Sequence, residues 1–355
     1  MLRSLSRLGS YTTKKTTLSA TTGRRSIVTL HRPSLSTTTP SLLPPRRTLM
    51  TITDASQYVV NAPSPYVIKP TCASSSSTSE SSSTPLLDGY ERVEGKDGKP
   101  GYALFQGKIE QSPNDDKAYR LIMLENGLEV LVISDPKADK ASAAMDVKVG
   151  HLSDPEDLQG LAHFCEHLMF MGTEKYPREN DYTEFLTQHS GSSNAFTGMD
   201  QTCYFFDVAP SALAPALDRF SQFFIAPVFD PSCSEREANA VHSENSKNLQ
   251  NDMWRMFQLD KSTSSRENHV YWRFGTGNKE TLWDEPMRKG IDVRERLIDW
   301  CEKHYSANIS KLVVLSKDSV EETTQLVIDQ FSAVKNRNLA PPNFVGSPLT
   351  EKELG

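Results

Sequence analysis

The sequence predicts an α+β fold in which a largely antiparallel sheet packs against helices. Segments with strand patterning come in pairs joined by short turns, and segments with helical spacing cluster between those pairs. A doubly wound parallel sheet would instead alternate single strands with single helices. The chain has 355 residues, of which 37% are hydrophobic. It is therefore long enough to bury a core, and its length suggests about two domains.

The first expected strands are residues 119–124 and 128–133, joined by Glu125-Asn126-Gly127. Asn-Gly between two apolar runs is a strong hairpin signal, because both residues tolerate positive φ. Further apolar runs predict strands over 141–149, 193–197, 202–208 and 311–315. Helical spacing of apolar residues predicts helices over 158–171, 179–189, 212–225, 232–257, 291–305 and 321–334.

The N-terminal segment differs in charge from the rest of the chain. Residues 1–50 contain nine Lys and Arg residues and no Asp or Glu, whereas the remainder has 30 basic against 45 acidic residues. A cationic segment rich in Ser and Thr is typical of a mitochondrial transit peptide, which predicts a matrix location. The alternatives are a disordered basic tail, or translation from Met50, which would give a cytosolic protein. The Ser-rich range 51–100 is expected to be a disordered linker before a folded module over 101–341.

Charge and hydropathy exclude several classes of protein. The net charge of −6 argues against a nucleic-acid-binding protein. No stretch reaches the roughly 18 apolar residues that a spanning helix needs, so no membrane span is expected. Five widely spaced cysteines fit neither a disulfide framework nor a zinc knuckle, and they favour a reducing compartment.

The most informative motif lies in the expected helix 158–171 and reads His163-Phe164-Cys165-Glu166-His167. Residues four apart share one helix face, so the imidazoles of His163 and His167 can bind one ion. Neutral imidazoles suit zinc, and the carboxylate of Glu166 beside them can take a proton from the attacking water. His-x-x-Glu-His is the inverted order of the common His-Glu-x-x-His zinc-protease motif. The alternative is a helix with two surface histidines.

A catalytic zinc ion needs a third protein ligand. The expected helix 232–257 offers Glu237 and Glu244. Seven residues are nearly two turns, so both carboxylates share one face. One of them can bind the ion while the other supports a ligand. An ordinary solvated helix surface is the alternative.

Several separated segments resemble the M16 metallopeptidases, or inverzincins, and within them the insulysin–pitrilysin branch. The resemblance covers about residues 115–350, in family order. The segments that carry it are His163-Phe164-Cys165-Glu166-His167, Met171-Gly172-Thr173-Glu174-Lys175-Tyr176-Pro177, Gly191-Ser192-Ser193-Asn194-Ala195-Phe196-Thr197, Tyr204-Phe205-Phe206-Asp207-Val208, Ser243-Glu244, Trp254-Arg255-Met256-Phe257-Gln258-Leu259 and Phe274-Gly275-Thr276-Gly277-Asn278-Lys279.

The resemblance implies a zinc metalloendopeptidase with one zinc ion per chain. His163, His167 and Glu244 match the family's zinc ligands. Glu166 matches the general base that acts on the attacking water, and Glu237 matches the supporting carboxylate of the family's catalytic site.

The resemblance also implies peptide substrates. Asn194 and Ala195 match the edge strand on which family substrates lie extended, and Phe196 would face the neighbouring side-chain pocket. Backbone pairing gives affinity with little readout of sequence, which suits cleavage of diverse short peptides.

Members of this branch are much longer and have a second half that helps to bind substrate. Residues 342–355 are expected to be a linker or the start of a second module. The chain is therefore interpreted as an N-terminal catalytic module that works with a C-terminal half or a partner subunit. Two other functions stay open: a subunit of the mitochondrial processing-peptidase type, and a non-catalytic module that binds peptides. Retention of Glu166 favours catalysis, because binding alone needs no base.

Overall fold

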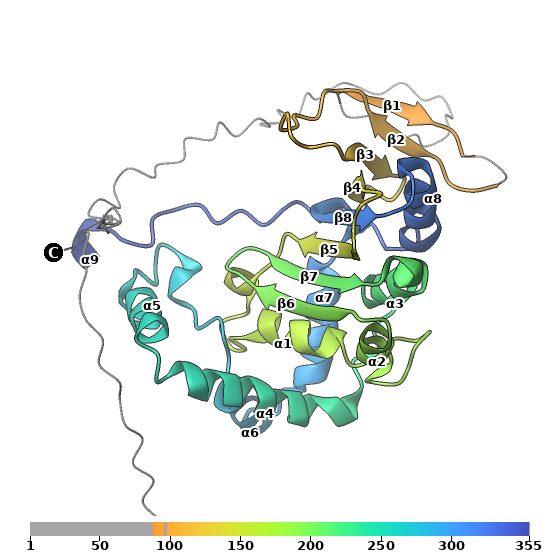
Figure 1. The fold of residues 1–355 in the computed structure, drawn as a ribbon. Helices are drawn as coiled ribbons and strands as arrows, with labels where there is room; N and C mark the ends of the chain where they lie inside the picture. Colours follow the sequence, from red (N-terminus) through yellow and green to blue (C-terminus); the bar gives the residue numbers. More distant parts are fainter. Residues whose placement is uncertain (1–87, 96–97, 355) are drawn as a thin grey trace, which may run out of the picture. The chain divides into compact units, whose positions relative to one another are not determined.

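The computed structural model describes residues 88–95 and 98–354. The chain divides into two units, residues 1–79 and 80–355, and everything described belongs to the second (Figure 1). The expected transit peptide 1–50, Met50 and most of the expected linker 51–100 lie outside the described residues.

The second unit is built on one sheet of eight strands in the order β1-β2-β3-β4-β8-β5-β7-β6 (Figure 1). Only the β4–β8 pair is parallel among the described strands, and the other neighbours are antiparallel. The expected α+β class with a largely antiparallel sheet is therefore confirmed. The strands are β1 (Tyr90–Val93), β2 (Tyr102–Phe105), β3 (Ala118–Leu124), β4 (Glu129–Ser134), β5 (Ala141–Val147), β6 (Ser192–Thr197), β7 (Thr202–Val208) and β8 (Ser310–Ser316).

The expected hairpin between β3 and β4 is present. Gly127 has a φ of 81°, which glycine adopts without strain, and its amide donates to the carbonyl of Leu124. Strands β1 and β2 were not expected. β1 lies inside the range 51–100 assigned to the linker, so the sheet extends N-terminal to the expected module boundary at residue 101.

Five of the six predicted helices are present, whereas the short helices over Glu285–Arg288 and Glu351–Leu354 were not predicted. The expectation of a single helix over 232–257 is wrong, because the chain breaks between Asn248 and Asp252. Asn251 is extended there, and its side-chain oxygen accepts a hydrogen bond from the Met253 amide at 2.9 Å, which caps the next helix. The helices are α1 (Leu161–Met169), α2 (Asp181–Gln188), α3 (Leu213–Ile225), α4 (Pro231–Asn248), α5 (Asp252–Thr263), α6 (Glu285–Arg288), α7 (Val293–His304), α8 (Val320–Phe331) and α9 (Glu351–Leu354).

The core lies between the sheet and the helices. Along β5, β7 and β8 buried and more accessible residues alternate, so each strand turns one face inward. Helices α1 and α2 contact β6, α3 contacts β5, and α8 contacts β3 and β4. Helix α4 contacts α1, so α1 lies between β6 and α4 (Figure 1). This arrangement leaves one face of α1 directed at α4.

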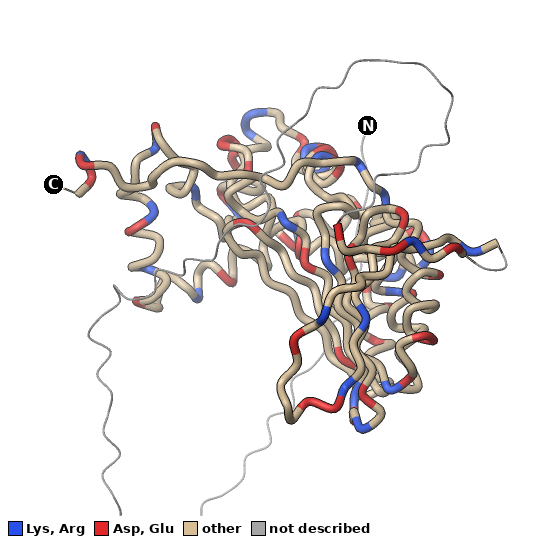
Figure 2. The backbone as a smooth tube through the Cα atoms, turned by 90° about the horizontal axis from the view of Figure 1, so that it is seen from above, with Lys and Arg blue, Asp and Glu red and all other residues tan. Residues whose placement is uncertain are grey.

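Acidic and basic residues are interspersed along the described part of the chain (Figure 2). No helix within that part is both long and apolar enough to cross a bilayer.

Candidate metal centre

Two features position α1, the helix that carries the histidines. Gly160 precedes it with a φ of 92°, and a Cβ atom there would lie 2.3 Å from the Cα atom of Gly277. Only glycine therefore fits. The carboxylate of Asp154 accepts hydrogen bonds from the amides of Gly160 at 2.7 Å and Ala162 at 2.8 Å, which satisfies donors of the first turn. The apolar face of α1 is buried, namely Leu161, Ala162, Phe164, Leu168 and Met169.

The opposite face of α1 brings three ligating groups together. Nε2 of His163 lies 3.6 Å from Oε2 of Glu244, and Nε2 of His167 lies 3.8 Å from the same oxygen. The two rings are 4.9 Å apart and nearly perpendicular. One ligand atom from each of the three residues lies within 4.8 Å of the others.

These separations suit a zinc ion. Zinc holds nitrogen and oxygen ligands at about 2 Å, so two ligands at the tetrahedral angle lie about 3.3 Å apart. The nitrogen–oxygen distances of 3.6 and 3.8 Å are close to that value. Two imidazoles and one carboxylate are also the donors of one common class of catalytic zinc site. The residues present therefore fit the ion.

The other nitrogen of each imidazole is already engaged. Nδ1 of His163 donates to the carbonyl of Thr276 at 2.8 Å, and Nδ1 of His167 donates to Oε2 of Glu237 at 3.3 Å. Each neutral ring thus keeps the lone pair of Nε2 for an ion, and such partners also fix the orientation of the ring. The structure places Glu237 behind His167, not beside Glu244.

The carboxylates around His167 make the site favourable for positive charge. Burial favours the neutral imidazole, but hydrogen bonds to Glu237 and Glu244 outweigh it and raise the pKa of His167 to about 9. The hydrogen bond from His167 also lowers the pKa of Glu237 and of Glu244. A proton on His167 and a cation among these groups therefore compete for the same negative surroundings.

Glu166 lies on the same helix as the histidines, and only 8% of its surface is exposed. Its Oε2 accepts a hydrogen bond of 2.6 Å from the hydroxyl of Thr197, at the end of β6. Burial raises the pKa of Glu166, while His163, Thr197 and His167 act in the opposite direction. A carboxylate with a raised pKa is suited to proton transfer near neutral pH.

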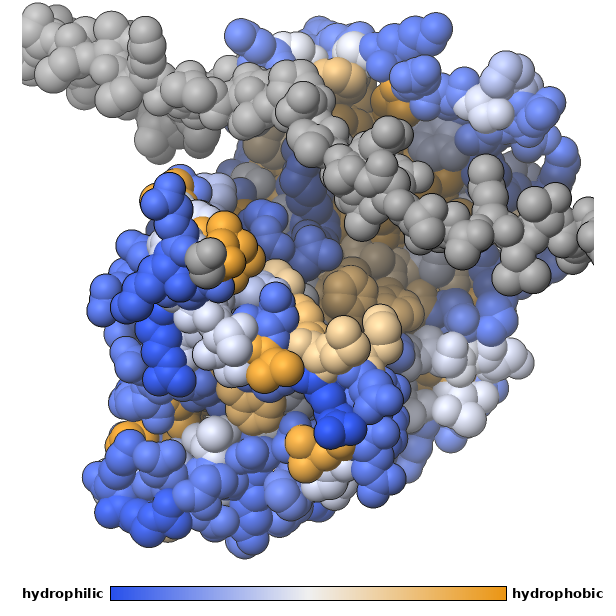
Figure 3. Space-filling model, turned by 90° about the vertical axis from the view of Figure 1, so that its left-hand side faces the viewer, coloured by the Kyte–Doolittle hydropathy of each residue, from blue (hydrophilic) through white to orange (hydrophobic). Residues whose placement is uncertain are grey.

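A cleft of about 1120 Å³ opens over these groups. One wall is β6, which carries Asn194, Ala195 and Phe196, and another is α5. β6 ends the sheet and pairs only with β7 among the described strands, so its other edge borders the cleft. Phe196 is 48% exposed there. Figure 3, viewed from the side on which α5 lies in Figure 1, shows apolar side chains exposed in and around a hollow.

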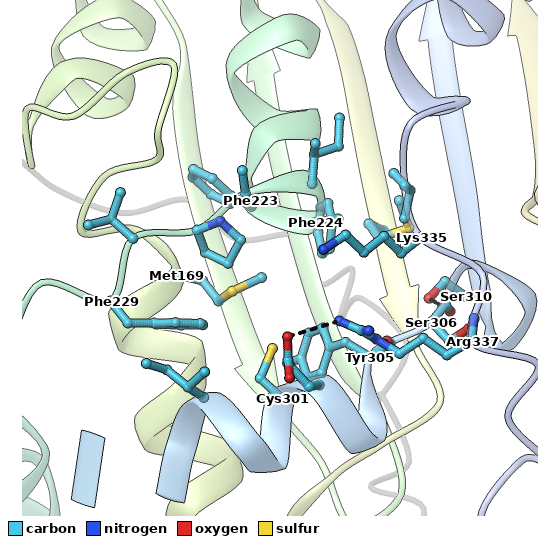
Figure 4. Close-up of a pocket in the computed structure, with 18 of the residues that line it drawn as sticks. Met169, Phe223, Phe224, Phe229, Cys301, Tyr305, Ser306, Ser310, Lys335 and Arg337 are labelled. Atoms are coloured by element: carbon cyan, nitrogen blue, oxygen red, sulfur yellow. Dashed lines mark hydrogen bonds and ion pairs between the residues drawn. The ribbon is translucent and has the colours of Figure 1, made fainter. Parts of the chain in front are cut away.

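A second cavity, of about 480 Å³, lies elsewhere in the fold. Figure 4 shows Met169, Phe223 and Phe229 on its apolar side and Arg337 on its polar side, where an ion pair of 3.8 Å joins Arg337 to Glu302. None of the expected site residues lines it. The groups with metal-binding and acid–base chemistry therefore face the cleft at β6.

Comparison with known proteins identifies the family that this chain resembles. Residues 129–267 match the model of the family described as Insulinase (Peptidase family M16). The chain is 49% identical to insulin-degrading enzyme of Mus musculus over 255 residues, which are 72% of this chain and 25% of that enzyme. It is 48% identical over 240 residues to the peroxisomal insulin-degrading enzyme-like 1 of Arabidopsis thaliana, covering 68% of this chain and 25% of that protein.

A solved structure is similar as well. The crystal structure of pitrilysin matches at a TM-score of 0.69 and 37% identity, covering 72% of this chain and 27% of pitrilysin. This chain belongs to peptidase family M16. The resemblance expected from the separated motifs is thereby confirmed. This M16 chain spans about a quarter of the length of the curated relatives it matches.

Two partners of the site in this M16 chain were not singled out from the sequence. The carbonyl of Thr276 is 113 residues from His163, and the hydroxyl of Thr197 is 31 residues from Glu166. Both residues lie in segments that carry the family resemblance. The signal for Thr276 is its place between Gly275 and Gly277, since paired glycines allow a close approach of backbone to the histidine helix.

Proposed function

We propose that this M16 chain carries the catalytic site of a zinc-dependent metalloendopeptidase acting on short peptides. The observation that carries the proposal is the convergence of His163, His167 and Glu244 next to the buried carboxylate of Glu166. The first three residues would hold one zinc ion per chain. When bound, zinc polarises the scissile carbonyl and lowers the pKa of the attacking water toward about 7.

Glu166 acts as the general base. Its carboxylate takes a proton from the attacking water and then passes it to the leaving amine. The hydroxyl of Thr197, 2.6 Å away, holds this carboxylate toward the cleft. Glu237 keeps His167 in the tautomer that leaves Nε2 free.

The substrate binds as an extended segment along β6. The free edge of Asn194 and Ala195 offers backbone donors and acceptors to a peptide, and the exposed ring of Phe196 borders a side-chain pocket. The proposed module comprises residues 101–341, with β1 added N-terminally. Groups from a C-terminal half or a partner subunit would complete substrate binding, because this chain spans about a quarter of its relatives.

A module that binds peptides without cleaving them is the second candidate, and the proposed need for groups from outside the chain favours it. A subunit of the mitochondrial processing-peptidase type is the third, favoured by residues 1–50. The hydrogen-bonded Glu166 beside the metal ligands supports catalysis over binding alone.

The test uses purified chain, its zinc content and a quenched fluorescent peptide. We expect one zinc ion per chain and turnover that disappears in Glu166→Gln while zinc is retained. Glu235→Gln is the matched control, because Glu235 is exposed on α4 and loses the same charge. Zinc with no turnover in the unaltered chain would favour the peptide-binding module. No zinc binding, or equal turnover in Glu166→Gln, would overturn the proposal.

A mitochondrial location is a separate proposal that rests on residues 1–50. The full chain and a version starting at Met50, each fused to a fluorescent protein, should locate to mitochondria and cytosol respectively. A peroxisomal marker belongs in the experiment, because the Arabidopsis thaliana relative is named peroxisomal. The same location for both versions would contradict the proposal.

A further inference from the structure

A buried lysine borders the cleft without a place in the proposed chemistry. Lys261, on α5, is only 1% exposed, and its Nζ donates a hydrogen bond of 2.9 Å to Nε2 of His151. Burial lowers the pKa of His151 to about 3, so this imidazole is a neutral acceptor. Burial lowers the pKa of Lys261 to about 8, against the opposing effect of Asp154, so the amine is mostly charged at neutral pH. A buried charge is costly, and its partners indicate what it does.

His151 supports the backbone that holds a proposed metal ligand. A Cβ atom at Gly275 would lie 2.3 Å from Cγ of His151, so the backbone of Gly275 lies directly on the imidazole ring. The next residue is Thr276, whose carbonyl accepts the hydrogen bond from Nδ1 of His163 at 2.8 Å. A short path of contacts therefore joins Lys261 to His163.

The same lysine acts on the start of α1. Asp154 attracts the ammonium of Lys261, and its carboxylate accepts from the amides of Gly160 and Ala162 in the first turn of the histidine helix. Arg273 ties the same two segments together, because its guanidinium donates to the carbonyl of Asp154. The lysine thus lies between the loop behind His163 and the cap of its helix.

We propose that Lys261 is a positioning residue of the metal centre, which acts through His151 on the Gly275 and Thr276 backbone and so fixes the imidazole of His163. This inference rests on the proposed function. The hydrogen bond that orients a ligating imidazole typically changes metal affinity by about 10–100-fold. The proposed role of Lys261 is indirect, because its hydrogen bond goes to His151 and not to a ligand atom or to Glu166.

The experiment measures the zinc dissociation constant by competition with a chromophoric chelator, and the absorption spectrum of the Co²⁺-substituted chain. Lys261→Met and His151→Leu should each weaken zinc binding by about 10-fold or more and alter the Co²⁺ spectrum. The double variant should lose no more than the stronger single variant, because both changes break one path. His151→Gln should retain most of the affinity, since its amide oxygen can still accept from Lys261.

Two controls distinguish a specific loss of zinc affinity from a loss of overall stability. Val314→Ala removes buried volume in β8, and the unfolding midpoints of all metal-free variants are measured. This variant should keep the original zinc affinity and Co²⁺ spectrum. The inference is overturned if Lys261→Met binds zinc as the unaltered chain does, if the two losses add in full, or if Val314→Ala weakens zinc equally. An unaltered chain that binds no zinc would instead overturn the proposed function.

Discussion

Oε2 of Glu237 lies 3.3 Å from Nδ1 of His167, on the side of the ring opposite Glu244. His167 is thus held between two carboxylates from one helix, α4, spaced by two turns. The carboxylate of Glu237 fixes the orientation of the ring, and the carboxylate of Glu244 lies where it could bind an ion together with Nε2.

Removing the first carboxylate should weaken metal binding without removing a ligand atom. Glu237→Gln is expected to raise the zinc dissociation constant by about 10–100-fold, because the imidazole loses a charged acceptor and becomes less basic. Chelator competition measures this change, with Glu235→Gln as the control of equal charge on the same helix. Equal affinities of the two variants would contradict a supporting role for Glu237.

The stability of the metal-free protein should depend on His167. Its pKa rises from 6.5 to about 9 on folding, so the folded state binds a proton more tightly than the unfolded chain does. This stabilisation is complete below pH about 6.5 and is lost as the pH rises through about 9, by up to about 3 kcal/mol in total. Urea unfolding in the presence of a chelator measures it. If the free energy of unfolding changes with pH in the same way in His167→Gln as in the unaltered chain, the assignment of this effect to His167 is wrong.

The hydroxyl of Thr197 should tune the base of the proposed reaction. Thr197→Val keeps the side-chain shape but removes the donor to Glu166, which raises the pKa of that carboxyl further. The acidic limb of kcat/KM should move to higher pH by about one unit, which corresponds to the loss of one hydrogen bond to a charged group. Zinc content should not change. Thr187→Val, on the exposed side of α2, is the control, and an identical pH profile for both would count against the contact.

Gly160 should be less replaceable than other glycines with positive φ. Gly160→Ala meets the Cα atom of Gly277 at 2.3 Å, whereas Gly290, with a φ of 69°, has open space around the same position. Gly290→Ala should lower the free energy of unfolding by about 1–2 kcal/mol through backbone strain alone. Gly160→Ala should cost more and also weaken zinc binding, because α1 must shift. Urea unfolding compares the two, and equal losses would show that the close approach is unimportant.

Local patterns predicted the parts of this fold that depend on neighbouring residues. Asn126-Gly127 gave the hairpin, and the spacing of His163, Glu166 and His167 placed all three on one helix. The break at Asn251 escaped prediction because residues on both sides have helical composition. Strand β1 escaped because it has four residues, two of them charged, and gains its partner only in the sheet.

The inner contacts of the site depend on distant parts of the chain. Nothing near His163 indicates that a carbonyl 113 residues away accepts a hydrogen bond from its ring, and nothing near Lys261 indicates that His151, 110 residues away, accepts one from its amine. Such pairs depend on how distant loops pack against each other in the folded chain. Hydrophobic periodicity describes local structure only and does not predict that packing. The two carboxylates of α4 were predicted to share a face, but their separate places around His167 required the packing of α4 on α1.

Strand β8 lies between β4 and β5, although it comes last in sequence among the described strands. β8 joins two groups of strands, β1 to β4 and β5-β7-β6. Until residues 310–316 have left the ribosome, no described strand connects these two groups. Each group then exposes an open edge on which another chain can pair. The histidine helix packs on the second group, so the sheet beneath the metal-binding residues is complete only after residues 310–316 have been synthesised. Contacts of such long sequence separation slow folding and lengthen the time during which a nascent chain depends on chaperones.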